Sequence, residues 1–258
     1  MNEEGLAVAG MGTDFADYDN DGLPDIFVTA LSGETYSLYR NRGDGSFEYR
    51  SPAAGLSQVS LLLSGWGTRL VDFDNDGWKD LFVAQGHVLD TIELTSDHLK
   101  YRQRPLLLRG TPRGFVDAGR EAGPALATPW AGRGAAFGDL DGDGDVDVVV
   151  ANCGESAYVL RNETGSHQHW LSLRLVGTRS NRDGQGARIR TTTPSGLVQL
   201  HTVSTAGSYQ SANDPRVLVG LGQDDRALLV EVTWPSGVVQ RLTDVRAGER
   251  LTLREPAR

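Results

Sequence analysis

Aspartates recur at one fixed spacing in three places along the chain, and that spacing is suited to holding a metal ion. Three segments align without gaps: GMGTDFADYDNDGLPDIFV from Gly10, GWGTRLVDFDNDGWKDLFV from Gly65 and GRGAAFGDLDGDGDVDVVV from Gly132. Each contains the pattern D-x-D-x-D-G-x-x-D. Carboxylates at alternate positions of a curled loop can converge on one centre, and Ca²⁺ accepts six to eight such hard oxygen ligands in flexible geometry. A divalent cation would also relieve the repulsion between carboxylates packed so closely.

The candidate ligands are the carboxylates at loop positions 1, 3, 5 and 9, together with the backbone carbonyl of position 7. They are Asp17, Asp19, Asp21, Leu23 and Asp25 in loop 1, Asp72, Asp74, Asp76, Trp78 and Asp80 in loop 2, and Asp139, Asp141, Asp143, Asp145 and Asp147 in loop 3. Glycine at position 6 permits a sharp turn. Asparagine or glycine at position 4 tolerates left-handed backbone. The alternative is three solvated acidic turns without metal, but three in-register copies favour the metal.

The residues on either side of the loops predict strands rather than the helices of an EF-hand. Position 12, which is a bidentate glutamate in an EF-hand, is Val28, Val83 and Val150 here. The runs DIFV, DLFV and DVVV leave the loops, and such β-branched and aromatic runs are typical of strands. Each repeat is therefore expected to be a β-hairpin with a calcium loop at its tip. Successive copies lie about 55 and 67 residues apart, which fits propeller blades with loops.

The three segments resemble FG-GAP/VCBS repeats, the calcium-loop hairpins of the integrin α-subunit propeller. The phrases YRNRGDGSFEYRSPAAGL (39–56) and LLRGTPRGFVDAGREAGPAL (107–126) resemble the linker between blades in the cartilage acidic protein family. In that family the repeats precede a carboxy-terminal ASPIC/UnbV domain. The resemblance implies propeller blades whose loops hold Ca²⁺.

The pattern changes from about residue 163, where acidic loops give way to short alternating runs separated by turn signals. Strands at regular spacing predict a sandwich-like all-β unit. HWLSLRLVGTRSNRDGQGARI (169–189) and VEVTWPSGVVQRL (230–242) resemble the ASPIC/UnbV domain. We therefore expect an all-β chain, with a partial β-propeller over residues 1–162 and a β-sandwich-like domain over residues 163–258.

A closed propeller needs roughly four to eight blades, and three would leave strand edges exposed. We therefore expect this chain to be the carboxy-terminal part of a longer protein with upstream blades, or a reduced form that needs a partner. The first residues, MNEEGLAVAGMG, lack the charged and then apolar pattern of a signal peptide.

Composition narrows the possible partners. The formal net charge is −9 over 258 residues, which opposes nucleic-acid binding because phosphate contacts need clustered basic residues. No apolar run is long enough to span a membrane. Cys153 is the single cysteine, so no intrachain disulfide can form, and we expect it to be a small packed residue. Arg42-Gly43-Asp44 is an RGD tripeptide, which we interpret as a turn before the strand containing Phe47.

The sequence contains no nucleophile elbow, zinc-protease motif or P-loop. The leading hypothesis is a non-catalytic, calcium-stabilised binding or adhesion module that is extracellular or displayed at the cell surface. Its partner would be a protein or carbohydrate that the sequence does not identify. The alternative is an accessory region of a larger secreted enzyme or transport-associated protein.

Overall fold

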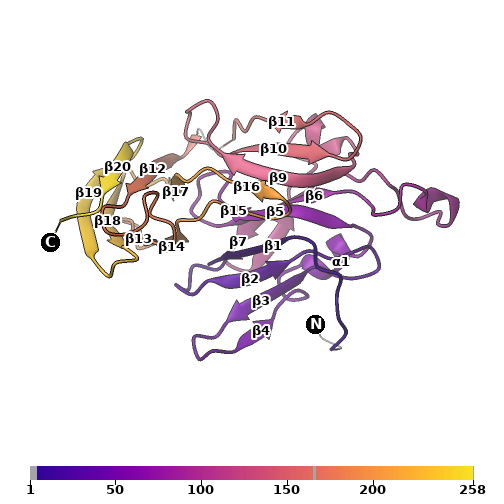
Figure 1. The fold of residues 1–258 in the computed structure, drawn as a ribbon, viewed down its shortest axis with the longest axis horizontal. Coiled ribbons are helices and arrows are strands. Elements are labelled where there is room, and N and C mark those ends of the chain that lie inside the picture. The colour runs from indigo at the N-terminus through magenta and orange to yellow at the C-terminus, as the bar shows by residue number, and fades with distance from the viewer. Residues whose placement is uncertain (1–4, 165–166, 258) are drawn as a thin grey trace.

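Strands make up almost all of the regular structure in this computed structural model, which describes residues 5–164 and 167–257. The all-β prediction is therefore confirmed. The helical segments with described bounds are short: α1 (Leu56–Ser60) and the 3₁₀ segments η1 (Ile92–Leu94) and η2 (Pro124–Ala127). Three blade-like sheets lie together, and a separate group of strands extends to one side of them (Figure 1).

The three blades are antiparallel sheets formed by strands consecutive in the chain. Blade 1 contains β1 (Thr13–Ala16), β2 (Asp25–Val28), β3 (Ser37–Asn41) and β4 (Phe47–Tyr49). Blade 2 contains β5 (Gly65–Val71), β6 (Asp80–Gln85), β7 (Leu106–Thr111) and β8 (Gly114–Asp117). Blade 3 contains β9 (Gly132–Gly138), β10 (Asp147–Asn152) and β11 (Tyr158–Leu160).

Each acidic loop connects the first two strands of its blade. The last residue before position 1 pairs with position 9 in every copy: Ala16 with Asp25, Val71 with Asp80, and Gly138 with Asp147. The strand register is therefore the same at all three loops. This confirms the prediction of hairpins with an acidic loop at each tip.

Blade 2 packs against a blade on each face, which explains the uninterrupted apolar run of β6. Leu81 and Val83 join the core between blades 1 and 2, whereas Phe82 and Ala84 join the core between blades 2 and 3. Side chains of a strand point alternately to the two faces of its sheet. Because both faces of this sheet are covered, alternation of apolar and polar residues would bury polar groups.

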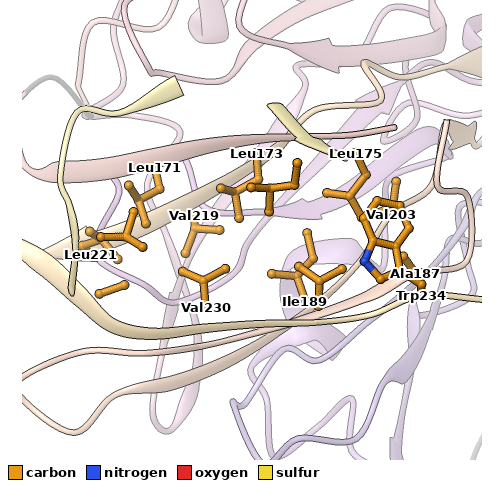
Figure 2. Packing of buried hydrophobic residues seen from close by; sticks show 14 residues of the cluster. Leu171, Leu173, Leu175, Ala187, Ile189, Val203, Val219, Leu221, Val230 and Trp234 are labelled. Carbon is orange, nitrogen blue, oxygen red and sulfur yellow. The ribbon is translucent and has the colours of Figure 1, made fainter. Parts of the chain in front are cut away.

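The carboxy-terminal strands form two sheets packed face to face. One sheet contains β17 (Val217–Gly222), β12 (His169–Val176) and β20 (Arg250–Arg254). The other contains β14 (Val198–Thr202), β13 (Arg188–Thr192), β18 (Arg226–Thr233) and β19 (Val239–Arg246). Leu171 and Leu173 of β12 meet Ile189 and Val230 of the facing sheet in one buried cluster (Figure 2). The predicted sandwich is thus present.

A short hairpin of this carboxy-terminal unit, β15 (Ala206–Gly207) and β16 (Ser211–Ala212), reaches back between the blades (Figure 1). The Thr68 backbone N–H of β5 donates to the Ser208 carbonyl at 2.8 Å. The Thr13 N–H of β1 donates to Ser208 Oγ at 2.7 Å. We call residues 204–218, which include the hairpin, the central segment. It supplies acceptors to inner-strand N–H groups of blades 1 and 2, groups that would otherwise lie at open sheet edges.

The sandwich also rests directly on the acidic loops. The Gly222 N–H donates to the Asn75 carbonyl in loop 2 at 2.8 Å. A side chain at Gly220 would place its Cβ 2.1 Å from Asp72 Oδ2. Gly144 of loop 3 lies so close to Trp170 that a Cβ there would be 2.0 Å from the indole. Loops 2 and 3 are therefore part of the interface between the blades and the sandwich.

Glu255, next to the end of β20, anchors the turn that follows β12. Its carboxylate accepts the backbone N–H groups of Thr178, Arg179 and Ser180 at 2.7–2.8 Å, and the hydroxyl of Ser236. Although burial opposes ionisation, these hydrogen bonds lower the pKa of Glu255 below its ordinary value.

The smaller sequence predictions have mixed outcomes. Arg42-Gly43-Asp44 lies in the turn between β3 and β4, where Asp44 accepts the Ser46 N–H at 2.9 Å, so the turn is confirmed. The expectation of a packed Cys153 is wrong, because this residue is exposed. No helix within residues 5–164 and 167–257 has the length and apolarity that crossing a membrane requires. We propose that the domain boundary lies between residues 162 and 163, after β11 and before β12.

Replacing Gly220 by alanine tests the contact between the sandwich and loop 2. We expect Gly220→Ala to lower the free energy of unfolding by about 1–3 kcal/mol, because the added methyl group overlaps Asp72 and the Asn75 backbone. Gly119→Ala is the control, because a Cβ there would meet only a carboxylate oxygen of exposed Asp117, at 3.3 Å. Urea unfolding measures both. Equal stability of the two variants would contradict this close contact.

Glu255→Gln tests the carboxylate turn by its pH dependence. Because the folded-state pKa of Glu255 is depressed, its contribution exists above the ordinary glutamate pKa and is lost as pH falls. The variant should therefore be less stable than the parent at pH 7, with the difference shrinking toward pH 3. Thermal unfolding across that range measures it, with Glu249→Gln as control. A difference that does not change with pH would contradict the depressed pKa.

Candidate metal centres

Each acidic loop brings three aspartates together at one point. One carboxylate oxygen from each of positions 1, 3 and 9 lies within 4.8 Å of the others in every loop. The groups are Asp17, Asp19 and Asp25 in loop 1, Asp72, Asp74 and Asp80 in loop 2, and Asp139, Asp141 and Asp147 in loop 3. Nine of the predicted ligand residues therefore converge as three equivalent groups.

The backbone of each loop has the conformation that its sequence requires. Asn20 and Asn75 at position 4 have φ of 56° and 58°. Asparagine is among the few residues other than glycine that adopt this left-handed region readily. The glycines at position 6 have φ between 87° and 96°, where other residues would be strained. These two positions curl the loop so that its alternate side chains point inward.

Backbone N–H groups fix the carboxylates at positions 1 and 9. In loop 2, Asp72 accepts the Asp76 and Gly77 N–H groups at 3.1 and 2.8 Å. Asp80 accepts the Phe73 N–H at 2.9 Å and the Gly110 N–H of β7 at 2.7 Å. Loop 1 has the equivalent bonds, and so does loop 3 except that Gly142 at position 4 donates to Asp139 in place of position 5. These carboxylates are thus held in place by the fold itself.

The carboxylates at position 5 lie outside the converging groups. Each accepts the N–H two residues further on: Leu23 to Asp21 at 2.9 Å, Trp78 to Asp76 at 2.8 Å, and Asp145 to Asp143 at 2.9 Å. In loop 1, the second oxygen of Asp21 also pairs with Arg40 at 2.7 Å. Position 5 therefore supports the turn in this structure. Its role as a ligand, and that of the carbonyls of Leu23, Trp78 and Asp145, stay predictions.

Burial makes the negative charge of these loops costly. It raises the pKa of Asp17 to about 6, that of Asp25 to about 7 and that of Asp80 to about 8. Burial likewise raises the pKa of Asp72. Removing a carboxylate from water disfavours its charged form, and neighbouring carboxylates add to that penalty. A bound cation would offset both effects.

One arginine per blade lies beside each loop, and the sequence analysis gave these residues no role. Arg40 pairs with Asp19 at 2.6 Å, and Arg161 pairs with Asp141 at 2.7 Å. Arg109 acts electrostatically on Asp76. Each directly precedes the residue whose N–H binds the position 9 aspartate. The signal for them was the repeated R-N or R-G dipeptide after the apolar residues of the third strand.

Hydrogen bonds connect the three loops in series. Asn20 Nδ2 of loop 1 donates to the Gly77 carbonyl of loop 2 at 2.9 Å. Asn75 Nδ2 of loop 2 donates to the Gly144 carbonyl of loop 3 at 3.3 Å and to Asp145 Oδ1 at 3.1 Å. The asparagine at position 4 therefore links each of the first two loops to the next loop along the chain.

The donor set fits a hard divalent cation. Three carboxylates provide anionic oxygens, which suit Ca²⁺ or Mg²⁺ rather than a soft metal. Among the residues that the structure describes, buried Asp19 Oδ1 has no hydrogen-bond partner, and such an acceptor is costly unless a cation or a donor satisfies it. Asp17, Asp19 and Asp25 could therefore hold an ion in loop 1, and the same positions could do so in loops 2 and 3. The ion would supply positive charge that fixes the loop.

Comparisons with known families agree with the two-part architecture. Residues 10–83 match the family model described as FG-GAP-like repeat. Residues 177–258 match the family model described as ASPIC and UnbV. The first match covers loops 1 and 2, and the second covers most of the sandwich.

Curated relatives match most of the chain. Cartilage acidic protein 1 of Homo sapiens is 27% identical over 93% of this chain and 43% of its own length. Cartilage acidic protein 1 of Mus musculus is 27% identical over 89% of this chain and 42% of its own length. The chain thus spans about two fifths of the relatives that it matches. It carries an FG-GAP-like repeat and an ASPIC and UnbV domain, and it is homologous to cartilage acidic protein 1.

Proposed function

We propose that this chain is a calcium-stabilised, non-catalytic binding module of the extracellular space or cell surface. The observation that carries the proposal is the convergence of three aspartates at the same positions in all three loops. Three independent copies of one oxygen-rich geometry are better explained by a shared ligand than by surface composition. Ca²⁺ suits it because its coordination is flexible and mixes carboxylate, carbonyl and water oxygens.

The position of the loops indicates what the ion does. Asp72 and Asp80 of loop 2 are buried, and loop 2 contacts β17 of the sandwich through Gly220 and Gly222. An ion that fixes loop 2 therefore also fixes the surface on which the sandwich rests. We infer a structural role: Ca²⁺ holds the blades and the sandwich in one arrangement, which presents a binding surface to a protein or carbohydrate partner.

The extracellular assignment rests on the affinity expected for such loops. Extracellular calcium modules bind with Kd of about 10⁻⁴–10⁻³ M, and calcium at that concentration is found outside cells. The homology to cartilage acidic protein 1 supports the same location.

Calcium removal should destabilise the protein. At 2 mM free Ca²⁺ and a Kd of about 10⁻⁴ M, each loop contributes about 2 kcal/mol by linkage. We expect excess EDTA to lower Tm by roughly 10–20 °C for three such loops, and Ca²⁺ in excess of the chelator to restore it. Differential scanning calorimetry measures this, with NaCl of matched ionic strength as control. Superimposable curves with EDTA and with Ca²⁺ would contradict the proposed function.

Asp74→Ala tests the ligand assignment, because it removes both carboxylate oxygens of position 3, whereas asparagine there would keep an amide oxygen that can bind Ca²⁺. We expect the Ca²⁺ stoichiometry to fall from three to two in isothermal titration calorimetry. The matched control is Asp44→Ala, a change outside the loops at an exposed turn, which should keep all three. An unchanged stoichiometry in Asp74→Ala would show that position 3 does not bind the ion.

A further inference from the structure

A cavity of about 420 Å³ lies where the three blades meet the central segment. Its walls come from the inner strands β1, β5 and β9, from β14 and from residues 204–218. The position 1 aspartates of all three loops, Asp17, Asp72 and Asp139, also line it. Because its walls come from all three blades and from the carboxy-terminal unit, the cavity forms only when the sandwich packs against the blades.

Two buried side chains in this cavity have polar nitrogen atoms that find no partner among residues 5–164 and 167–257. Lys79, which directly precedes β6, is 5% exposed, and within those residues its Nζ has no hydrogen-bond partner. His201 of β14 is 9% exposed, and its Nε2 has none within the same residues. Both residues line the cavity. Buried groups left unsatisfied in this way cost about 1–3 kcal/mol each, and more when charged, so a ligand that satisfied both would be favoured.

Arg69 of β5 adds a third basic group to the same wall. Lys79 and Arg69 both act electrostatically on His201, whose pKa is lowered by burial and by these two cations. Three basic side chains from three separate elements therefore face one space. A neutral imidazole can still donate one N–H, which makes His201 a hydrogen-bond donor to an acceptor in the cavity.

With Ca²⁺ in the loops, the charge balance of the cavity would favour an anion. The cations in its walls are Arg69, Lys79 and Arg216, and the carboxylates other than the three position 1 aspartates are Asp14 and Asp214. Arg216 already pairs with Asp214 and donates to the Asp139 carbonyl at 2.8 Å. The remaining walls include apolar side chains, among them Leu70, Phe137, Leu200 and Leu218. Once the loop aspartates hold Ca²⁺, which rests on the function proposed above, Asp14 is the remaining carboxylate that acts electrostatically on both Lys79 and Arg69, so these two cations exceed it by one positive charge.

We propose that this cavity binds a small molecule carrying an oxyanion group, either a carboxylate or a tetrahedral sulfate-like or phosphate-like group. Lys79 and His201 donate to the oxyanion, Arg69 lies beside it, and the apolar walls contact the rest of the molecule. This is a second binding site at the junction between blades and sandwich, beside the three points where the loop aspartates converge.

The chain contains two lysines, Lys79 and Lys100, which allows a direct test. Protein labelled with ¹³C at lysine Cε, kept in 2 mM Ca²⁺, should give two lysine signals that Lys79→Met and Lys100→Met assign. Benzoate and sodium sulfate are the anionic probes, titrated at constant ionic strength. We expect a saturable shift of the Lys79 signal alone. Lys100, which is exposed and paired with Glu93 at 3.2 Å, is the internal control.

Benzamide has nearly the shape of benzoate but no charge, so comparing the two probes tests whether binding requires the negative charge. A Lys79 shift with sulfate, or with benzoate but not benzamide, supports the oxyanion site, and the comparison of the two anions shows whether an apolar body adds affinity. His201→Phe should weaken binding about fivefold, from the loss of one hydrogen bond. No Lys79 shift with either anion, or equal shifts with benzoate and benzamide, would overturn the proposal. The main measurement is made on the wild-type chain, so it does not depend on whether a variant folds well. The calcium function is tested separately, by the effect of EDTA in calorimetry.

Discussion

Repulsion between buried carboxylates is the constraint on which the rest of this structure depends. Three aspartates meet in each loop, and the loops themselves are bonded to one another through Asn20 and Asn75. Burial raises the pKa of several of these groups, so their charged forms are unfavourable without a counter-ion. Arginines at the loop edges offset part of that charge. A divalent cation in each loop would offset the remainder at the point where the carboxylates meet.

The carboxy-terminal sandwich packs against these same loops. The sandwich has its own buried core, yet it also places Gly220 and Trp170 against loops 2 and 3 and sends the central segment between the blades. Hydrogen bonds from Thr13 and Thr68 to Ser208 use donors at the inner edges of β1 and β5. The carboxy-terminal domain thus protects edges that the three blades would otherwise leave open.

Local features of the fold and the site could be predicted from the sequence because short-range chemistry determines them. The left-handed Asn20 and Asn75, the glycines after them and the apolar strands that follow all lie within a dozen residues of one another. The convergence of positions 1, 3 and 9 follows from that local geometry. Position 5 was predicted to be a ligand like its neighbours, and that stays a prediction; in this structure its carboxylate also accepts the N–H two residues later, a local turn that the sequence analysis did not foresee.

Long-range features could not be predicted in this way. Lys79 looks like an ordinary solvated residue beside acidic neighbours, and only the docking of residues 200–218 makes it a buried group facing a cavity. The contact of Ser208 with Thr13 joins residues far apart in the chain. Cys153 follows an apolar strand, which favoured burial, but it lies beyond β10 and is exposed. Each of these depends on where a distant element packs, which one sequence does not reveal.

An anomalous difference map is the most direct measurement of the central claim, from crystals grown in millimolar Ca²⁺ with data collected at a wavelength where calcium scatters anomalously. The account predicts three peaks, one in each loop, each within about 2.3–2.6 Å of carboxylate oxygens from positions 1, 3 and 9. Water or no density at the centres of all three loops would contradict it.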